Sequence, residues 1–324
     1  MPDTSFSAFE IPTGSGIRDN MPTFSRDKSP EQPSAMKKPL LFVLAITLFI
    51  CGCSTVSLFY RNADWYLQHK ISSYTTFNAR QKEQIRQDVT DYMQWHRKNA
   101  LPEYILFLQN LNGAAQYQGQ LKVEEVALLR KQLVNLYQIT MAPAIDPAAK
   151  MLSMLDSGQI QELEKHLAEE NQQQLDEYLK ASRDAYLEKR ANKTVNFIEW
   201  LAGDLNAGQE RQIRDMSRHI PVVVDQYIRN RQDNQNKLMA LMNGHAGEEK
   251  IAAFISSWIF TPEETRTPQQ QLAMQALERA SDEMIVSIHA LLTAKQKNHI
   301  HKVISSYIDD MRAEIARSAH DSSK

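Results

Sequence analysis

The chain has 324 residues, and its 37 Lys and Arg side chains nearly balance its 39 Asp and Glu side chains. A net charge of −2 predicts neither a basic face for nucleic acid nor an acidic tail. Both cysteines, Cys51 and Cys53, lie early in the chain, so the rest has no disulfide framework and must be stabilised by a well-filled core.

Residues 1–35 hold five of the 12 prolines and show no apolar period. Such a stretch cannot bury enough surface to offset the entropy of ordering, so we expect it to be disordered. We interpret it as a leader created by an upstream start assignment, with Met36 as the true start. The alternative is a genuine cytoplasmic tail that is removed together with the segment that follows it.

Residues 36–52 have the three parts of an export signal: two lysines, an apolar run from Leu40 to Ile50, and a small residue, Gly52. A membrane-spanning helix needs about 20 apolar residues, and this run is too short. The segment therefore predicts a signal peptide rather than a transmembrane helix.

The end of this segment, Ile50-Cys51-Gly52-Cys53, resembles the bacterial lipobox. The resemblance implies that Cys53 is acylated, with palmitate among the possible chains, and becomes the new N-terminus. Ser54 follows where aspartate would retain the protein, which by the same resemblance favours the periplasmic face of the outer membrane over the inner membrane. The first expected partner is thus the membrane, reached through a lipid anchor.

From residue 53 to residue 324 glycine is scarce and apolar residues recur every three or four positions. This pattern predicts an all-α, multi-helix bundle that forms one periplasmic domain. Pro102 is expected in the first turn of a helix, where its missing N–H costs nothing. The helices expected in the first half cover residues 56–74, 79–98, 102–118 and 122–141, followed by a short piece that ends near residue 155.

A long helix is expected over residues 159–201. Its centre, residues 168–174, is polar on every side, so we expect it to project or to span two subdomains with a boundary near residues 202–206. Pro221 should kink or split the next helix, residues 207–242. The remaining helices are expected over residues 248–260, 269–291 and 294–318, with a polar loop at residues 261–268.

One pentapeptide pattern occurs four times, each with a capping residue followed three positions later by glutamine. The pattern predicts four helix starts closed by capping boxes. The pentapeptides also resemble the Leu-Thr-x-x-Gln motifs of small periplasmic stress chaperones, although only the last matches that pattern fully. They are Phe77 to Gln81, Leu155 to Gln159, Leu205 to Gln209 and Leu292 to Gln296.

Three segments carry a family resemblance: Asp64-Trp65, the run from Gln94 to Arg97, and the run from Leu101 to Tyr104. Together with the lipobox they resemble a family of predicted lipoproteins of Gram-negative bacteria, catalogued as a domain of unknown function. The resemblance implies an all-α periplasmic lipoprotein and supplies no catalytic residues.

A polar and aromatic cluster is the one candidate site: Asp64, Trp65, Trp95, His96 and Arg97. On a helical wheel His96 falls at the middle of a buried stripe, which is typical of a core histidine with one or two hydrogen bonds. If the first two helices pack together, Asp64 would orient His96 or pair with Arg97. An enzyme that uses Asp64, His96 and Arg97 is the alternative.

The sequence shows no motif for metal or cofactor binding. No two of the nine histidines are three or four residues apart, and there is no Glu-x-x-His, nucleophile elbow or phosphate loop in residues 53–324. We therefore expect no metal, no cofactor and no catalytic residue. The predicted function is that of a non-catalytic binding, scaffold or assembly lipoprotein that contacts envelope proteins; a chaperone for unfolded clients is the alternative.

Overall fold

The computed structural model describes residues 55–180 and 182–321. The predicted leader, the signal segment, Cys53 and Ser54 lie outside the described residues. Within them the chain consists of helices joined by short turns, and no strand is present, which confirms the all-α prediction.

The bounds of the helices follow the predicted segments closely in most places. The first half contains α3 (Thr55–Ser72), α4 (Ala79–Trp95), the π-helical turn η1 (His96–Ala100), α5 (Leu101–Gln116), α6 (Val123–Met141), η2 (Ala142–Ala144), α7 (Ile145–Ser153) and α8 (Ser157–Lys180). The second half contains α9 (Arg183–Ala202), α10 (Ala207–His219), α11 (Val224–Asn243), α12 (Glu248–Phe260), η3 (Pro262–Thr265), α13 (Pro268–Leu291) and α14 (Ala294–Asp321).

The helix predicted over residues 159–201 is in fact two helices, α8 and α9, so that prediction is wrong in its length. Ser182 interrupts the helix with a non-helical backbone conformation, φ −58° and ψ 155°. Its hydroxyl accepts a hydrogen bond from the Ala185 backbone N–H at 3.2 Å, which caps α9. The split predicted at Pro221 is confirmed, since α10 ends at His219 and α11 begins at Val224.

The polar centre of α8 packs against α11 rather than projecting. Asn171 is buried and donates to the Gln235 side-chain oxygen at 2.6 Å, while Arg231 donates to the Asn171 side-chain oxygen. Polar side chains at a helix contact are stable when they satisfy one another. The absence of an apolar stripe in residues 168–174 therefore reflects a polar helix contact.

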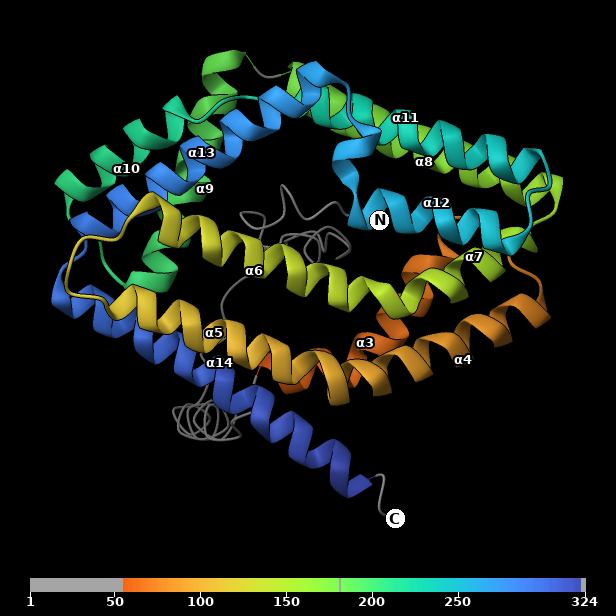
Figure 1. Cartoon of the computed structure of the whole chain (residues 1–324), viewed down its shortest axis with the longest axis horizontal. Helices are drawn as coiled ribbons and strands as arrows, with labels where there is room; N and C mark the ends of the chain where they lie inside the picture. The colour runs from red at the N-terminus through yellow and green to blue at the C-terminus, as the bar shows by residue number, and fades with distance from the viewer. Residues whose placement is uncertain (1–54, 181, 322–324) are drawn as a thin grey trace, which may run out of the picture.

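Two hydrophobic cores stabilise the molecule. One is formed mainly by α3, α4, α7, α8, α11 and α12, and the other by α5, α9, α10, α13 and α14. The two halves of the chain pack against each other, because α8 lies beside α11, α7 beside α12 and α5 beside α14 (Figure 1), and α6 contacts α13. Each of these four pairs joins a helix of the first half to a helix of the second.

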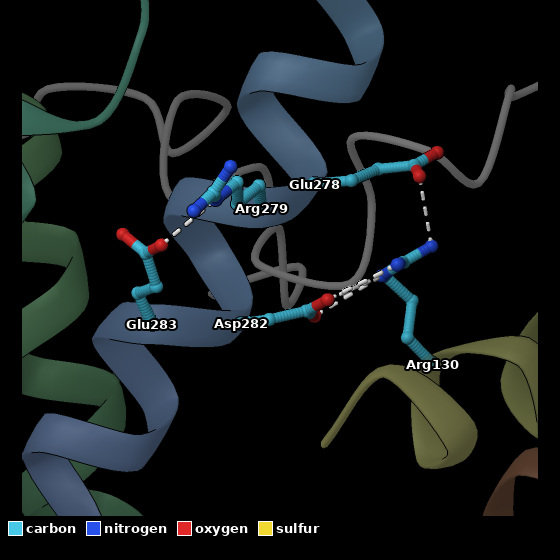
Figure 2. A network of polar contacts seen from close by, with 5 residues as sticks. All are labelled: Arg130, Glu278, Arg279, Asp282 and Glu283. Atoms are coloured by element: carbon cyan, nitrogen blue, oxygen red, sulfur yellow. Dashed lines mark hydrogen bonds and ion pairs between the residues drawn. The ribbon is translucent and has the colours of Figure 1, made fainter. Parts of the chain in front are cut away.

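An ion pair between the partly exposed Arg130 and the buried carboxylate of Asp282 connects α6 to α13 (Figure 2). The Arg130 guanidinium donates to both carboxylate oxygens of Asp282, at 3.0 to 3.2 Å, and pairs with Glu278 at 3.0 Å. The Asp282 side chain is only 3 % exposed. On the same helix Arg279 pairs with Glu283 at the surface, so α13 carries one partly buried and one exposed ion pair within two turns.

None of the helices in the described ranges is both long enough and apolar enough to cross a membrane.

Candidate functional site

The four predicted helix starts are all closed by capping boxes. At α4 the Asn78 side chain accepts from the Gln81 backbone N–H at 3.0 Å, and the Gln81 side chain accepts from the Asn78 backbone N–H at 3.0 Å. The same reciprocal bonds join Asp156 to Gln159, Asn206 to Gln209 and Thr293 to Gln296. The capping-box prediction is confirmed.

The glutamines of the first two helix starts also bind each other, and we call them the first glutamine pair. Gln81 donates to the Gln159 side-chain oxygen at 3.0 Å, and Gln159 donates in return at 2.7 Å. Each amide also donates to a carbonyl just ahead of the other helix, Gln81 to Met154 at 3.3 Å and Gln159 to Thr76 at 2.8 Å. The starts of α4 and α8 are thereby joined across 78 residues.

The second glutamine pair, Gln209 and Gln296, repeats this design. The two amides exchange hydrogen bonds of 2.9 and 3.1 Å, and they donate to the carbonyls of Leu291 and Asp204, both at 2.8 Å. All four glutamines are only 6 % or 7 % exposed. Buried amides that form all of their hydrogen bonds stabilise the contact between two helix starts. This structural role accounts for the recurring pentapeptide.

His96 lies in η1 and its closest polar contact is Tyr60 of α3. The imidazole Nδ1 and the Tyr60 hydroxyl are 2.6 Å apart. Three tyrosine rings surround the imidazole, with ring centroids 5.6 to 5.8 Å away: Tyr60, Tyr92 and Tyr104. The hydroxyls of Tyr92 and Tyr104 bond Thr140 of α6, so the cluster joins α3, η1, α5 and α6.

Arg97 pairs with Glu314 of α14 and not with Asp64, so that part of the prediction is corrected. Its Nε lies 3.2 Å from the Glu314 carboxylate, and its Nη2 donates to the Tyr60 carbonyl at 3.1 Å. Glu314 lies 217 residues from Arg97. One buried oxygen of the Asp64 carboxylate, Oδ1, has no hydrogen-bond partner, although α3 and α4 do pack together as expected.

The two tryptophans of the predicted cluster lie apart. Trp95 is half-buried beside His96, with a ring-centroid separation of 6.4 Å. Trp65 points outward from α3 and stacks on His69 at 5.3 Å. The structure therefore brings Trp95, His96 and Arg97 together with Tyr60 and leaves Trp65 on the surface.

The π-helical turn η1 carries His96 and Arg97, which contact Tyr60 of α3 and Glu314 of α14. The Leu101 N–H donates to the His96 carbonyl, one residue further back than in an α-helix. Pro102 is the cause, because it has no N–H to give to the Lys98 carbonyl and its ring would clash with that group. The predicted end of the helix before Leu101 is thus a π-helical turn, and α4 continues through this turn into α5.

Burial sets the charge states in this cluster. Desolvation, assisted by the neighbouring Arg97 charge, lowers the pKa of His96 to about 4. Desolvation also raises the pKa of Tyr92 to about 12 and raises the pKa of Tyr60 and Tyr104 above the ordinary value. At neutral pH the imidazole and the three phenols are therefore uncharged. The positive charge of Arg97 is paired with the negative charge of Glu314.

A family model described as a family of unknown function, DUF6279, matches residues 73–258. The match covers more than half of the chain. The chain belongs to the DUF6279 family. The part of this DUF6279 chain that matches contains His96, Arg97 and the first glutamine pair, while Tyr60 and the whole of α14 lie outside it.

The predicted membership of a family of unknown function is confirmed. No curated protein and no solved structure matches this DUF6279 chain.

Two grooves on this DUF6279 protein lie away from the His96 cluster. One is lined by residues 72–77 together with Lys82, Glu162 and His166, and the other by residues of α7, α11 and the start of α12. Within residues 55–180 and 182–321 no group of histidine, cysteine or carboxylate side chains is placed to hold a metal ion. The geometry around His96 is that of a packed junction between helices.

Replacing His96 with glutamine should reduce the decrease in the free energy of unfolding that occurs when the pH falls from 7 to 5. The pKa of His96 is about 4 when folded and about 6.5 when unfolded, so the neutral ring stabilises the fold above pH 6.5. This contribution is lost as the pH falls toward 4, and it amounts to about 2 kcal/mol between pH 7 and pH 5. Urea unfolding at several pH values measures it.

The comparison is made above pH 4.5, because carboxylates such as Glu162 have lowered pKa values and contribute below that range. The pKa of His289 is also lowered, by desolvation and then by Lys297, so some slope remains in the variant. Equal slopes for the wild type and His96→Gln would show that His96 is not held neutral by the fold.

Proposed function

We propose that the protein is a lipid-anchored lipoprotein of the Gram-negative envelope that acts by binding or scaffolding rather than by catalysis. The observation that carries the proposal is the lipobox ending at Cys53, only two residues before the start of α3 at Thr55. Ser54 supports sorting to the outer membrane. The helical body would then be held at the periplasmic face of that membrane.

The contacts of the candidate cluster support a structural role for it. His96 is uncharged, bonded to Tyr60 and enclosed by aromatic rings, and the Arg97 charge is paired with Glu314. Catalytic acids and bases are usually poised near the working pH and open to a substrate. The pKa of His96, about 4, is far from neutral pH, and the surrounding tyrosine rings leave the imidazole little access to a substrate.

The glutamine pairs do not add support for the chaperone alternative. The motif glutamines are buried between helix starts, so their amides are not available to a client. Binding would instead use exposed apolar side chains of the body. Leu128 on α6 and Leu272 on α13 are each more than half exposed, and we use them as probe positions.

The test combines palmitate labelling with crosslinking in cells that produce the full chain. The wild type should incorporate labelled palmitate and sediment with outer membranes, whereas Cys53→Ser should lose the label. Cys51→Ser is the matched control and should keep the label, because Ile50, Gly52 and Cys53 remain in place. A photo-crosslinking residue at position 128 or 272 should then trap the same envelope protein repeatedly.

Each part of this proposal has its own contrary outcome. Failure to label the wild type, or equal labelling of Cys53→Ser, removes the lipid anchor. Successful labelling without a recurrent crosslinked protein removes the binding role and leaves only the anchor.

A further inference from the structure

One face of α3 exposes large apolar side chains to solvent. Leu58, Phe59, Trp65 and Tyr66 are each between 54 % and 67 % exposed, and we call them the exposed α3 stripe. Their spacing of one, seven and eight residues places them on one side of the helix. Burying them needs a surface that the described helices do not supply.

The opposite face of α3 is fully used by the fold. Tyr60 and Ala63 are buried in the first core, and Tyr60 contacts His96. The roll of α3 about its own axis is therefore fixed by packing. The exposed α3 stripe keeps its outward direction for the same reason.

The chemistry of the stripe matches a membrane interface. Trp and Tyr are enriched where a bilayer meets water, because their rings are apolar at one end and polar at the other. Arg61, exposed on one flank, and Lys70 on the other are placed to meet anionic headgroups. Lys70 also binds Glu170 at 3.0 Å, which holds it beside the stripe.

The position of α3 in the chain selects the bilayer over other occupants. Two residues span at most about 7 Å, so Thr55, the first residue of α3, stays within that distance of Cys53. At 18 residues α3 is about 27 Å long, which gives the stripe room to lie along a surface. A lipid attached at Cys53 would bring the stripe to the membrane surface.

We propose that α3 lies in the headgroup region of the membrane that carries the anchor, with the exposed α3 stripe inserted among the lipids. This inference rests on the proposed lipid anchor. It adds a second attachment with a fixed direction, so that the helical body is held in one orientation instead of rotating about a flexible tether.

The test uses the full, lipidated protein in vesicles of phosphatidylethanolamine and phosphatidylglycerol. Brominated acyl chains in these vesicles quench nearby tryptophans. Trp65→Phe should remove at least half of the quenching seen with the wild type. Trp200→Phe is the matched control, because Trp200 is exposed on α9, outside the stripe, and its loss should leave the quenching nearly unchanged.

The mass of the purified protein separates the two proposals. If lipid is present at Cys53 and Trp65→Phe is quenched as strongly as the wild type, α3 does not insert and this inference alone is overturned. If no lipid is present at Cys53, the anchor is absent and both proposals fail.

Discussion

Replacing Gln81 with alanine should lower the free energy of unfolding by about 3 kcal/mol. The change removes the bond that Gln81 accepts from the Asn78 N–H, both bonds between Gln81 and Gln159, and the bond to the Met154 carbonyl. Gln159 keeps its bonds to Thr76 and Asp156. A lost cap costs about 1 kcal/mol, and each buried polar group left unsatisfied costs about 1–3 kcal/mol. Urea unfolding followed by circular dichroism measures the loss.

Gln270→Ala is the matched control. Gln270 is equally buried and forms a capping box with Thr267, but its amide meets only a backbone carbonyl, that of Gln226 at 3.5 Å. The expected cost is about 1 kcal/mol, that of the cap. A cost as large as that of Gln81→Ala would show that pairing contributes nothing beyond capping.

A double-mutant cycle isolates the pairing itself. Gln81→Ala combined with Gln159→Ala should cost about 1–2 kcal/mol less than the sum of the single changes, because the second change removes a partner that is already unpaired. Gln81→Ala combined with Gln209→Ala should be additive within about 0.5 kcal/mol, since these residues belong to different glutamine pairs.

Replacing Arg130 with methionine should cost about 3–5 kcal/mol, because it leaves the buried Asp282 carboxylate without its cation. Methionine preserves most of the apolar stem of arginine, so the loss reports the ion pair more than the packing. Urea unfolding of the variant gives the value. The slope of unfolding against urea shows whether α6 and α13 still unfold with the rest.

Two further variants test the origin of this loss. Adding Asp282→Leu to Arg130→Met should recover most of the stability, because a buried pair replaced by apolar groups is often neutral. Arg279→Ala removes the exposed pair with Glu283 on the same helix and should cost less than about 1 kcal/mol. Equal costs for Arg130→Met and Arg279→Ala would contradict a special role for burial.

The candidate site was only partly predictable from the sequence. The buried stripe on α4 follows from helical spacing, and Ile85 and Val89 are indeed buried. The partner of Arg97 was not predictable, because Glu314 lies 217 residues away and no local pattern distinguishes it from other glutamates. Tyr60 carried a weak signal, since it precedes Asp64 by one helical turn.

The domain boundary near residues 202–206 and the assignments to residues 1–54 remain predictions. The turn between α9 and α10 packs in the second core through Ala202 and Leu205, close to the second glutamine pair. The boundary can therefore be examined with the same variants. If Gln209→Ala unfolds both cores together, the described residues behave as one cooperative unit.

The sequence by itself determined most of the helices, the four starts with capping boxes and the break at Pro221, because apolar spacing, capping boxes and proline act within a few residues of the chain. It did not determine the break at Ser182 between α8 and α9. Tertiary structure decided which helix starts join, that Arg97 meets Glu314, and which face of α3 stays exposed. These depend on contacts between residues tens to hundreds of positions apart, whose energies arise only when the helices pack. A glutamine three residues after a capping residue can be recognised from the local sequence. The second glutamine to which it binds cannot, because that residue lies far away in the chain.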